Sequence, residues 1–156
     1  GGAGVPDPDD WGEQFADVSE EDENADEEEV EERLRNVVFP PGLIDNILVT
    51  LAAIEARNGV YFSARVSTQL TAYLRTIPAY ARITGQDMST ALYHCASNGC
   101  IIEDDPTHPR QYRFTERGRF VAYFLLRRNS EMGPRNRVLR RKLIQYLHGR
   151  LLQRRG

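Results

Sequence analysis

The sequence has 156 residues and a formal net charge of −3, but its charge is divided very unevenly along the chain. Residues 1–32 hold 15 of the 23 acidic residues and no Lys or Arg, whereas residues 33–156 hold all 20 basic and only 8 acidic residues, a formal charge of +12. No apolar stretch is long enough to cross a bilayer and no signal-peptide core is present, so we expect a soluble, intracellular protein without a membrane partner. Because its first residue is glycine, we expect a fragment or a processed product.

Residues 1–38 make up an acidic arm that we expect to be disordered. Prolines, early glycines and dense carboxylates leave too little apolar surface to offset the entropy of ordering. Trp11, Phe15 and Val18 are exceptions, and their spacing puts them on one side of a short helix. Two interpretations stay open: the arm is a solvating tail, or it docks on a protein partner through Trp11 and Phe15.

The folded part is predicted to begin with a long helix after Phe39-Pro-Pro-Gly42, because a residue before proline avoids the helical conformation. The helix ends near Asn58-Gly59, a good C-terminal cap. Its apolar stripe is Leu43, Ile44, Ile47, Leu48, Leu51 and Ile54.

A short extended piece, Val60 to Phe62, should follow this helix. Ser63 is a candidate N-cap for a second helix, which Pro78 ends. The apolar residues of that helix are Val66, Leu70, Tyr73, Leu74 and Ile77.

The stretch from Ile77 to Ile102 is predicted to contain two helices, a tight turn and a strand. Pro78 suits the first position of a short helix, whose apolar face is Ala79, Ala81 and Ile83. Thr84-Gly-Gln-Asp87 fits a capping box and starts a helix from about Gln86 to Ser97. Its core face is Met88, Ala91, Leu92 and Cys95, and its presented face is Gln86, Ser89, Thr90, Tyr93, His94 and Ser97.

Asn98-Gly99 should stop this helix, and residues 101–115 should form a β-hairpin with its loop at 104–110. In the second strand, Tyr112 and Phe114 point to one side and Arg113 to the other. Helix, turn, polar-faced helix and hairpin together resemble a winged helix-turn-helix domain over about residues 63–128. The expected fold is therefore mostly α with a small β-hairpin: a winged helix-turn-helix domain with flanking helices.

Two further helices are expected after the hairpin. Phe120, Val121, Phe124 and Leu125 predict a helix that packs back on the core, which completes a domain of residues 39–130. Residues 131–156 contribute a basic C-terminal helix, whose narrow stripe must be buried on this domain or on a second copy, as in a homodimer. That stripe is Leu139, Leu143, Tyr146 and Leu147.

Chemical motifs are scarce, so we expect no enzyme, cofactor or metal. No glycine-rich phosphate loop, nucleophile elbow or zinc spacing occurs. Cys95 lies on the predicted core face and His94 near the presented one, so the soft-metal candidates, which also include Cys100 and His108, do not converge. The acidic residues of the hairpin region are expected at solvated positions; they are Glu103, Asp104, Asp105 and Glu116.

The winged-helix resemblance implies a set of DNA-binding residues. Those facing the major groove would be Gln86, Ser89, Thr90, Tyr93 and His94, and those meeting phosphates would be Arg110, Arg113, Arg117 and Arg119. The C-terminal helix adds Arg137, Arg140 and Arg141 as candidates. The preference for arginine, with Lys142 the only lysine, fits either codon bias or phosphate recognition.

The leading hypothesis is a non-enzymatic DNA-binding factor, transcriptional or chromosome-associated, which would be nuclear or nucleoid-associated. The presented face has no Arg or Lys, so the alternative is a winged-helix scaffold subunit that docks on protein with Tyr93 as anchor. In the leading hypothesis, the acidic arm is an autoinhibitory mimic of phosphate or recruits a basic partner.

Overall fold

The computed structural model describes residues 39–63, 65–102 and 111–153. The predictions made for the acidic arm, including Trp11 and Phe15, lie outside these residues. The same holds for the hairpin loop, which contains Arg110 and His108. The described part is mostly helical with a small antiparallel sheet, as expected from the sequence.

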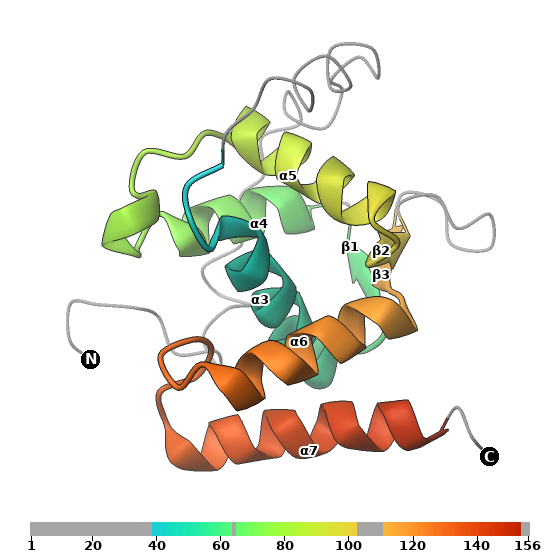
Figure 1. Cartoon of the computed structure of the whole chain (residues 1–156). Helices are drawn as coiled ribbons and strands as arrows, with labels where there is room; N and C mark the ends of the chain where they lie inside the picture. Colours follow the sequence, from blue (N-terminus) through green and yellow to red (C-terminus); the bar gives the residue numbers. More distant parts are fainter. Residues whose placement is uncertain (1–38, 64, 103–110, 154–156) are drawn as a thin grey trace.

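The first described helix, α3 (Leu43–Asn58), runs through the middle of the fold. It contacts α6, α7 and the sheet, so it is buried on most sides, from Leu43 through Glu55. In Figure 1 the α4–α5 pair lies on one side of α3 and the α6–α7 pair on the other. The prediction of this helix is confirmed, and the chain leaves it at Gly59 with a φ of 106°, which glycine adopts readily.

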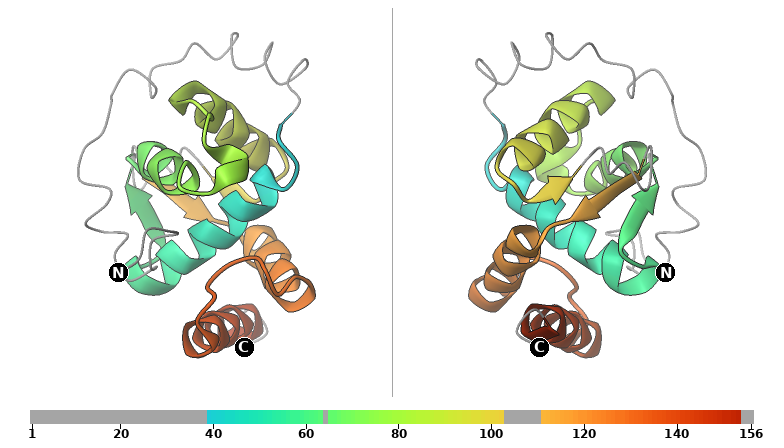
Figure 2. Two further views of the ribbon diagram at one scale, coloured as in Figure 1. Left: turned by 90° about the vertical axis from the view of Figure 1, so that its left-hand side faces the viewer. Right: turned by 90° about the vertical axis from the view of Figure 1, so that its right-hand side faces the viewer.

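Three short strands form an antiparallel sheet beside α3 (Figure 2). They are β1 (Tyr61–Ser63), β2 (Ile101–Ile102) and β3 (Gln111–Phe114), in the order β1-β3-β2. Phe62 pairs with Tyr112, and Ile101 pairs with Phe114. The predicted hairpin is therefore joined by a third strand, which the sequence indicated only as an extended piece.

Between β1 and β2 lie α4 (Val66–Leu74), a 3₁₀ turn, η3 (Pro78–Tyr80), and α5 (Gly85–Ser97). The α4 helix ends at Leu74, before the predicted Ile77. The apolar face predicted for the short helix is confirmed at Ile83, which is buried, but it is wrong at Ala79 and Ala81, which are exposed. Tyr80 is buried in their place. The Tyr80 hydroxyl donates to the Pro41 carbonyl at 2.9 Å and thereby fixes the turn to the start of α3.

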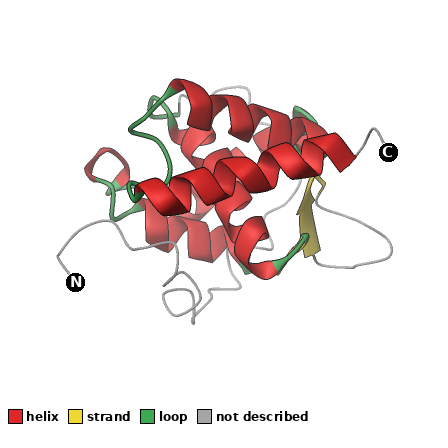
Figure 3. Cartoon of the chain, turned by 90° about the horizontal axis from the view of Figure 1, so that it is seen from below, coloured by secondary structure: helices red, strands yellow, loops and turns green. Residues whose placement is uncertain are grey.

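The last two helices, α6 (Glu116–Arg128) and α7 (Arg137–Gln153), pack against each other and against α3. Figure 3, seen from below, shows α7 lying across the other helices. Leu143 and Leu147 are buried there, so these two members of the predicted apolar stripe are covered within this chain, whereas Leu139 and Tyr146 are partly exposed. In the described part of the chain, no helix is long and apolar enough to span a membrane.

Candidate nucleic-acid or protein interface

The helix α5 is fixed at its start by the predicted capping box. The Thr84 hydroxyl accepts a hydrogen bond from the Asp87 N–H at 3.0 Å, and the Asp87 carboxylate accepts one from the Thr84 N–H at 2.9 Å. The predicted core face is confirmed: its four members Met88, Ala91, Leu92 and Cys95 are all buried. The rotation of α5 about its axis is set by this buried face.

Most of the predicted presented face of α5 lies outward. Gln86, Ser89 and Tyr93 are partly exposed and Ser97 is exposed. Thr90 is a correction, because only 1% of its surface is exposed and its hydroxyl donates to the Gln86 carbonyl at 2.9 Å. A threonine can satisfy its hydroxyl on its own helix in this way, so it can be buried where polarity alone predicts exposure.

His94 is partly exposed, and its ring meets the edge of Phe39 at a centroid distance of 5.7 Å. The chain that enters α3 therefore covers one side of His94. His94 does not converge with Cys95 or Cys100, which are both buried and form no disulfide bond. Within the described ranges, no group of three or more His, Cys, Asp and Glu residues could hold a metal ion.

The arginines predicted to meet phosphates, on the hairpin and after it, have different surroundings. Arg113 is partly exposed on the central strand β3, paired with Tyr61 on one side and Ile102 on the other. Arg117 is exposed at the start of α6, beside Gly99 and within hydrogen-bond reach of the Cys100 thiol. Burial raises the pKa of that thiol, and the charge of Arg117 opposes the shift. Arg117 thus lies close to the end of α5.

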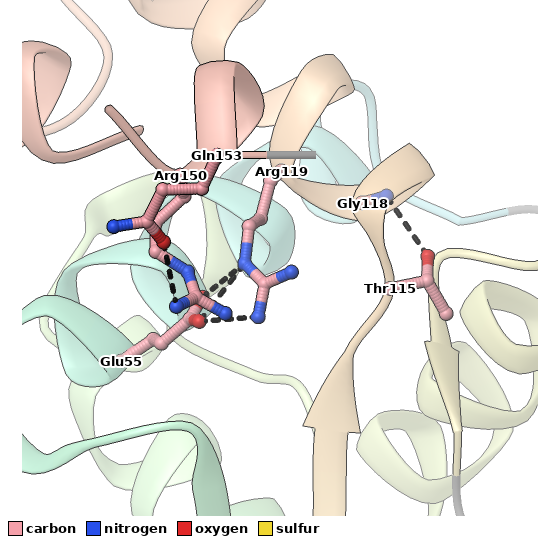
Figure 4. Close-up of polar contacts among 6 residues, drawn as sticks. All are labelled: Glu55, Thr115, Gly118, Arg119, Arg150 and Gln153. Atoms are coloured by element: carbon pink, nitrogen blue, oxygen red, sulfur yellow. Dashed lines mark hydrogen bonds and ion pairs between the residues drawn. The ribbon is translucent and has the colours of Figure 1, made fainter. Parts of the chain in front are cut away.

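Arg119 is buried, which corrects its predicted role as a phosphate contact. Its guanidinium donates from Nε and Nη2 to Oε1 of Glu55, at 2.9 and 2.6 Å (Figure 4). Glu55 is itself buried in α3, so the two charges neutralise each other away from water. Tyr146 of α7 adjoins the same carboxylate, and burial, reinforced by Glu55, raises its pKa to about 12. This cluster joins α3, α6 and α7.

The arginines of α7 divide into two kinds. Arg137 and Arg141 are exposed. Arg140 is partly buried and donates to the carbonyls of Leu126, Asn129 and Met132, so it closes the connection between α6 and α7. In Figure 1, α7 lies at the opposite end of the molecule from α5, so Arg137 and Arg141 do not extend the α5 surface.

Two arginines that sequence reasoning overlooked lie before α5. Arg82 is exposed two residues ahead of the Thr84 cap. Arg75 is exposed at the end of α4, and its Nε donates to the Ile83 carbonyl at 2.7 Å. For Arg82, the position just before a capping box was the available signal. Together with Arg117, they place cationic side chains near both ends of α5.

The α6 helix carries two exposed phenylalanines. Phe120 is 51% exposed and Phe124 44% exposed, with ring centroids 4.7 Å apart. The prediction that they pack on the core is wrong, because α6 turns a different side inward. The buried residues of that side are Gly118, Arg119, Ala122 and Leu126.

A cleft of about 540 Å³ lies between the start of α3, η3 and the connection from α6 to α7. Its lining mixes apolar and polar side chains, among them Tyr73, Ile77, Asn46 and Met132. Burial raises the pKa of Tyr73 to about 12. The cleft is on a different part of the surface from the capping box of α5.

Comparisons with protein-family models, with curated proteins and with solved structures found no match to this chain. Functional inference therefore depends on the residues and geometry of the chain itself.

Proposed function

We propose that residues 39–153 form a winged-helix domain of a non-enzymatic DNA-binding factor, with α5 as the helix that enters the major groove. The order of α4, a tight turn, α5 and the β2–β3 hairpin supports this proposal. So does the pairing of β3 with β1, which attaches the hairpin to the strand after α3. In such a domain, side chains on the outward face of the second helix read base edges.

The observation that carries the proposal is a polar outward face on α5 with arginines near both of its ends. Gln86 and Ser89 offer hydrogen-bonding groups of the kind that contact base edges. Arg82 before the helix and Arg117 beyond it offer charges for phosphates on either side. The formal charge of +12 on residues 33–156 adds a general attraction for a polyanion.

The acidic arm fits the same proposal as a regulator. Its charge is opposite to that of the rest of the chain, and a tether gives it a high effective concentration near any anion-binding surface. It would compete with DNA phosphates, or it would recruit a basic protein.

The second candidate function is a scaffold subunit that binds protein through α5. Specific features favour it: the outward face of α5 has no Arg or Lys, and it has Tyr93, a residue type typical of interface anchors. Phe39 packs on His94 at one side of this face, and this aromatic contact supports the second candidate.

Two matched substitutions test the DNA-binding role of α5. Gln86→Glu adds one negative charge on the outward face of α5, and Gln145→Glu adds the same charge on an exposed position of α7. A charge about 4 Å from a phosphate costs roughly 1 kcal/mol in water, so Gln86→Glu should weaken duplex binding by about fivefold. Gln145→Glu should change it much less. Fluorescence anisotropy with a labelled duplex measures both.

Gln86→Glu should not impair folding, because a glutamate in the first turn of α5 interacts favourably with the helix dipole. Equal effects of the two substitutions would remove α5 as the DNA-reading helix. If the full chain binds no duplex, and Tyr93→Ala releases a protein partner recovered with it, the scaffold function replaces the DNA-binding one.

A further inference from the structure

An unpartnered aromatic surface on α6 differs in place and chemistry from the outward face of α5. Phe120 and Phe124 lie one turn apart, are 51% and 44% exposed, and are in mutual ring contact at 4.7 Å. Most large apolar side chains of the described residues are buried instead, so this pair stands out on the surface. Exposed, contiguous apolar groups of this kind mark interaction sites.

Exposed arginines border the pair on its own helix. At about 3.6 residues per turn, Arg117, Arg127 and Arg128 fall on the same side of α6 as the two phenylalanines. All three are exposed, and Arg127 also lies over the Tyr123 ring at 5.8 Å. The surface therefore combines a small apolar centre with a positive border. We call these five residues the α6 patch.

The acidic arm contains a segment with the complementary composition. Trp11, Phe15 and Val18 follow one another at the spacing of a helix side. The residues around them in 7–22 supply only negative charge: Asp7, Asp9, Asp10, Glu13, Asp17, Glu20, Glu21 and Asp22. This segment has apolar residues among negative charges, and the α6 patch has phenylalanines bordered by positive guanidinium groups. The two are therefore complementary in charge and in apolar character.

The tether permits this contact. Residues 19–38 separate the segment from Phe39, and such a chain can extend to roughly 65 Å. A domain of this size has a radius of gyration of about 13 Å, so every part of its surface is within reach. Tethering in the same chain also gives effective concentrations in the millimolar range, which makes even a weak contact populated.

From these observations we infer that the α6 patch is the docking site of the chain's own segment Trp11 to Val18. A second copy of the patch is a poor occupant, because a symmetric contact would bring Arg117, Arg127 and Arg128 against like charges. This inference goes beyond the proposed function, since it requires no DNA and rests on the phenylalanines of α6; Arg117 is the one residue that the two surfaces share.

Trp11 is the only tryptophan of the chain, so its fluorescence reports docking directly. In the full-length chain at low salt, the emission should be blue-shifted and protected from acrylamide relative to the denatured chain. The double substitution Phe120→Gln/Phe124→Gln should shift the emission toward that of the denatured chain, with an unchanged circular dichroism spectrum. Arg128→Glu should move it in the same direction.

Val138→Gln is the matched control. Val138 is 47% exposed, and it lies roughly 15 Å along α7 from His148, the residue stacked on Tyr123 of α6. Its substitution removes a similarly exposed apolar side chain and should leave the Trp11 emission unchanged.

Three results would overturn the inference. The first is an emission in the full-length chain equal to that of the denatured chain. The second is a blue shift that disappears on dilution, which assigns the contact to a second copy. The third combines two observations: Trp11 stays solvent-exposed in every variant, and the double phenylalanine variant loses binding to a single-stranded oligonucleotide. That result would assign the α6 patch to nucleic acid.

Discussion

Gly118, in the first turn of α6, lies close to Cys100 and to Phe114 of β3. A Cβ built on this residue would be 2.2 Å from the carbonyl oxygen of Cys100 and 2.5 Å from the ring of Phe114. Real Cβ atoms do not approach a backbone oxygen so closely, so either α6 or the end of β2 would have to move. The hydroxyl of Thr115 accepts the Gly118 N–H at 3.0 Å and holds the turn in place (Figure 4).

We therefore expect Gly118→Ala to destabilise the fold by about 2 kcal/mol, because overpacking outweighs the better helix propensity of alanine. Gly149→Ala in α7 is the control: no atom lies within 4 Å of its Cβ position. There the substitution should stabilise by roughly 0.5 to 1 kcal/mol. Urea unfolding measures both values. Equal effects at the two positions would show that α6 and the sheet are not in close contact.

The burial of two polar residues could not be predicted from the sequence. Thr90 and Arg119 were assigned to a surface because they are polar, yet both are buried with their polar groups bonded. The partner of Thr90 is four residues away, but that of Arg119 is 64 residues away in another helix. Periodicity describes one helix at a time, so it cannot identify such a distant carboxylate.

At the scale of elements, the ion pair between Glu55 and Arg119 determines which side of α6 is buried. With Arg119 turned toward α3, the small residues Gly118 and Ala122 face inward, and Phe120 and Phe124 are left outside. Sequence reasoning assumed that the aromatic residues were the inward ones. The buried charge pair overrides this assumption, because an unpaired charge in the core costs more than an exposed ring.

A double-mutant cycle tests this role of the pair. Glu55→Leu and Arg119→Met should each destabilise by about 3 to 5 kcal/mol, because each leaves a buried charge without its partner. The double variant should be more stable than either single variant. Urea denaturation supplies the four free energies; if the two losses simply add, the charges are not coupled in the folded protein.

The elements with strong local signals could be predicted: α3 from its apolar stripe, α5 from its capping box, and the hairpin from its alternation. The strand β1 could not be predicted as part of the sheet, since its three residues are too few to show a period and its partner β3 lies about 50 positions later in the sequence.

At the scale of the whole molecule, the proposed function depends on the separation of opposite charges along the chain. The helix α5 is at the opposite end of the fold from α7 (Figure 1). The basic residues of α7 therefore contribute to the general field of the protein and not to the contacts of α5. A salt-dependent attraction for a polyanion is the direct consequence.

The most direct test of DNA binding is a titration of the full-length chain with duplex DNA over a series of salt concentrations. If Arg82 and Arg117 each meet one phosphate, the logarithm of the binding constant should fall with the logarithm of salt with a slope of about −2. Absence of binding at the lowest salt, or an affinity that does not change with salt, would contradict the proposed function.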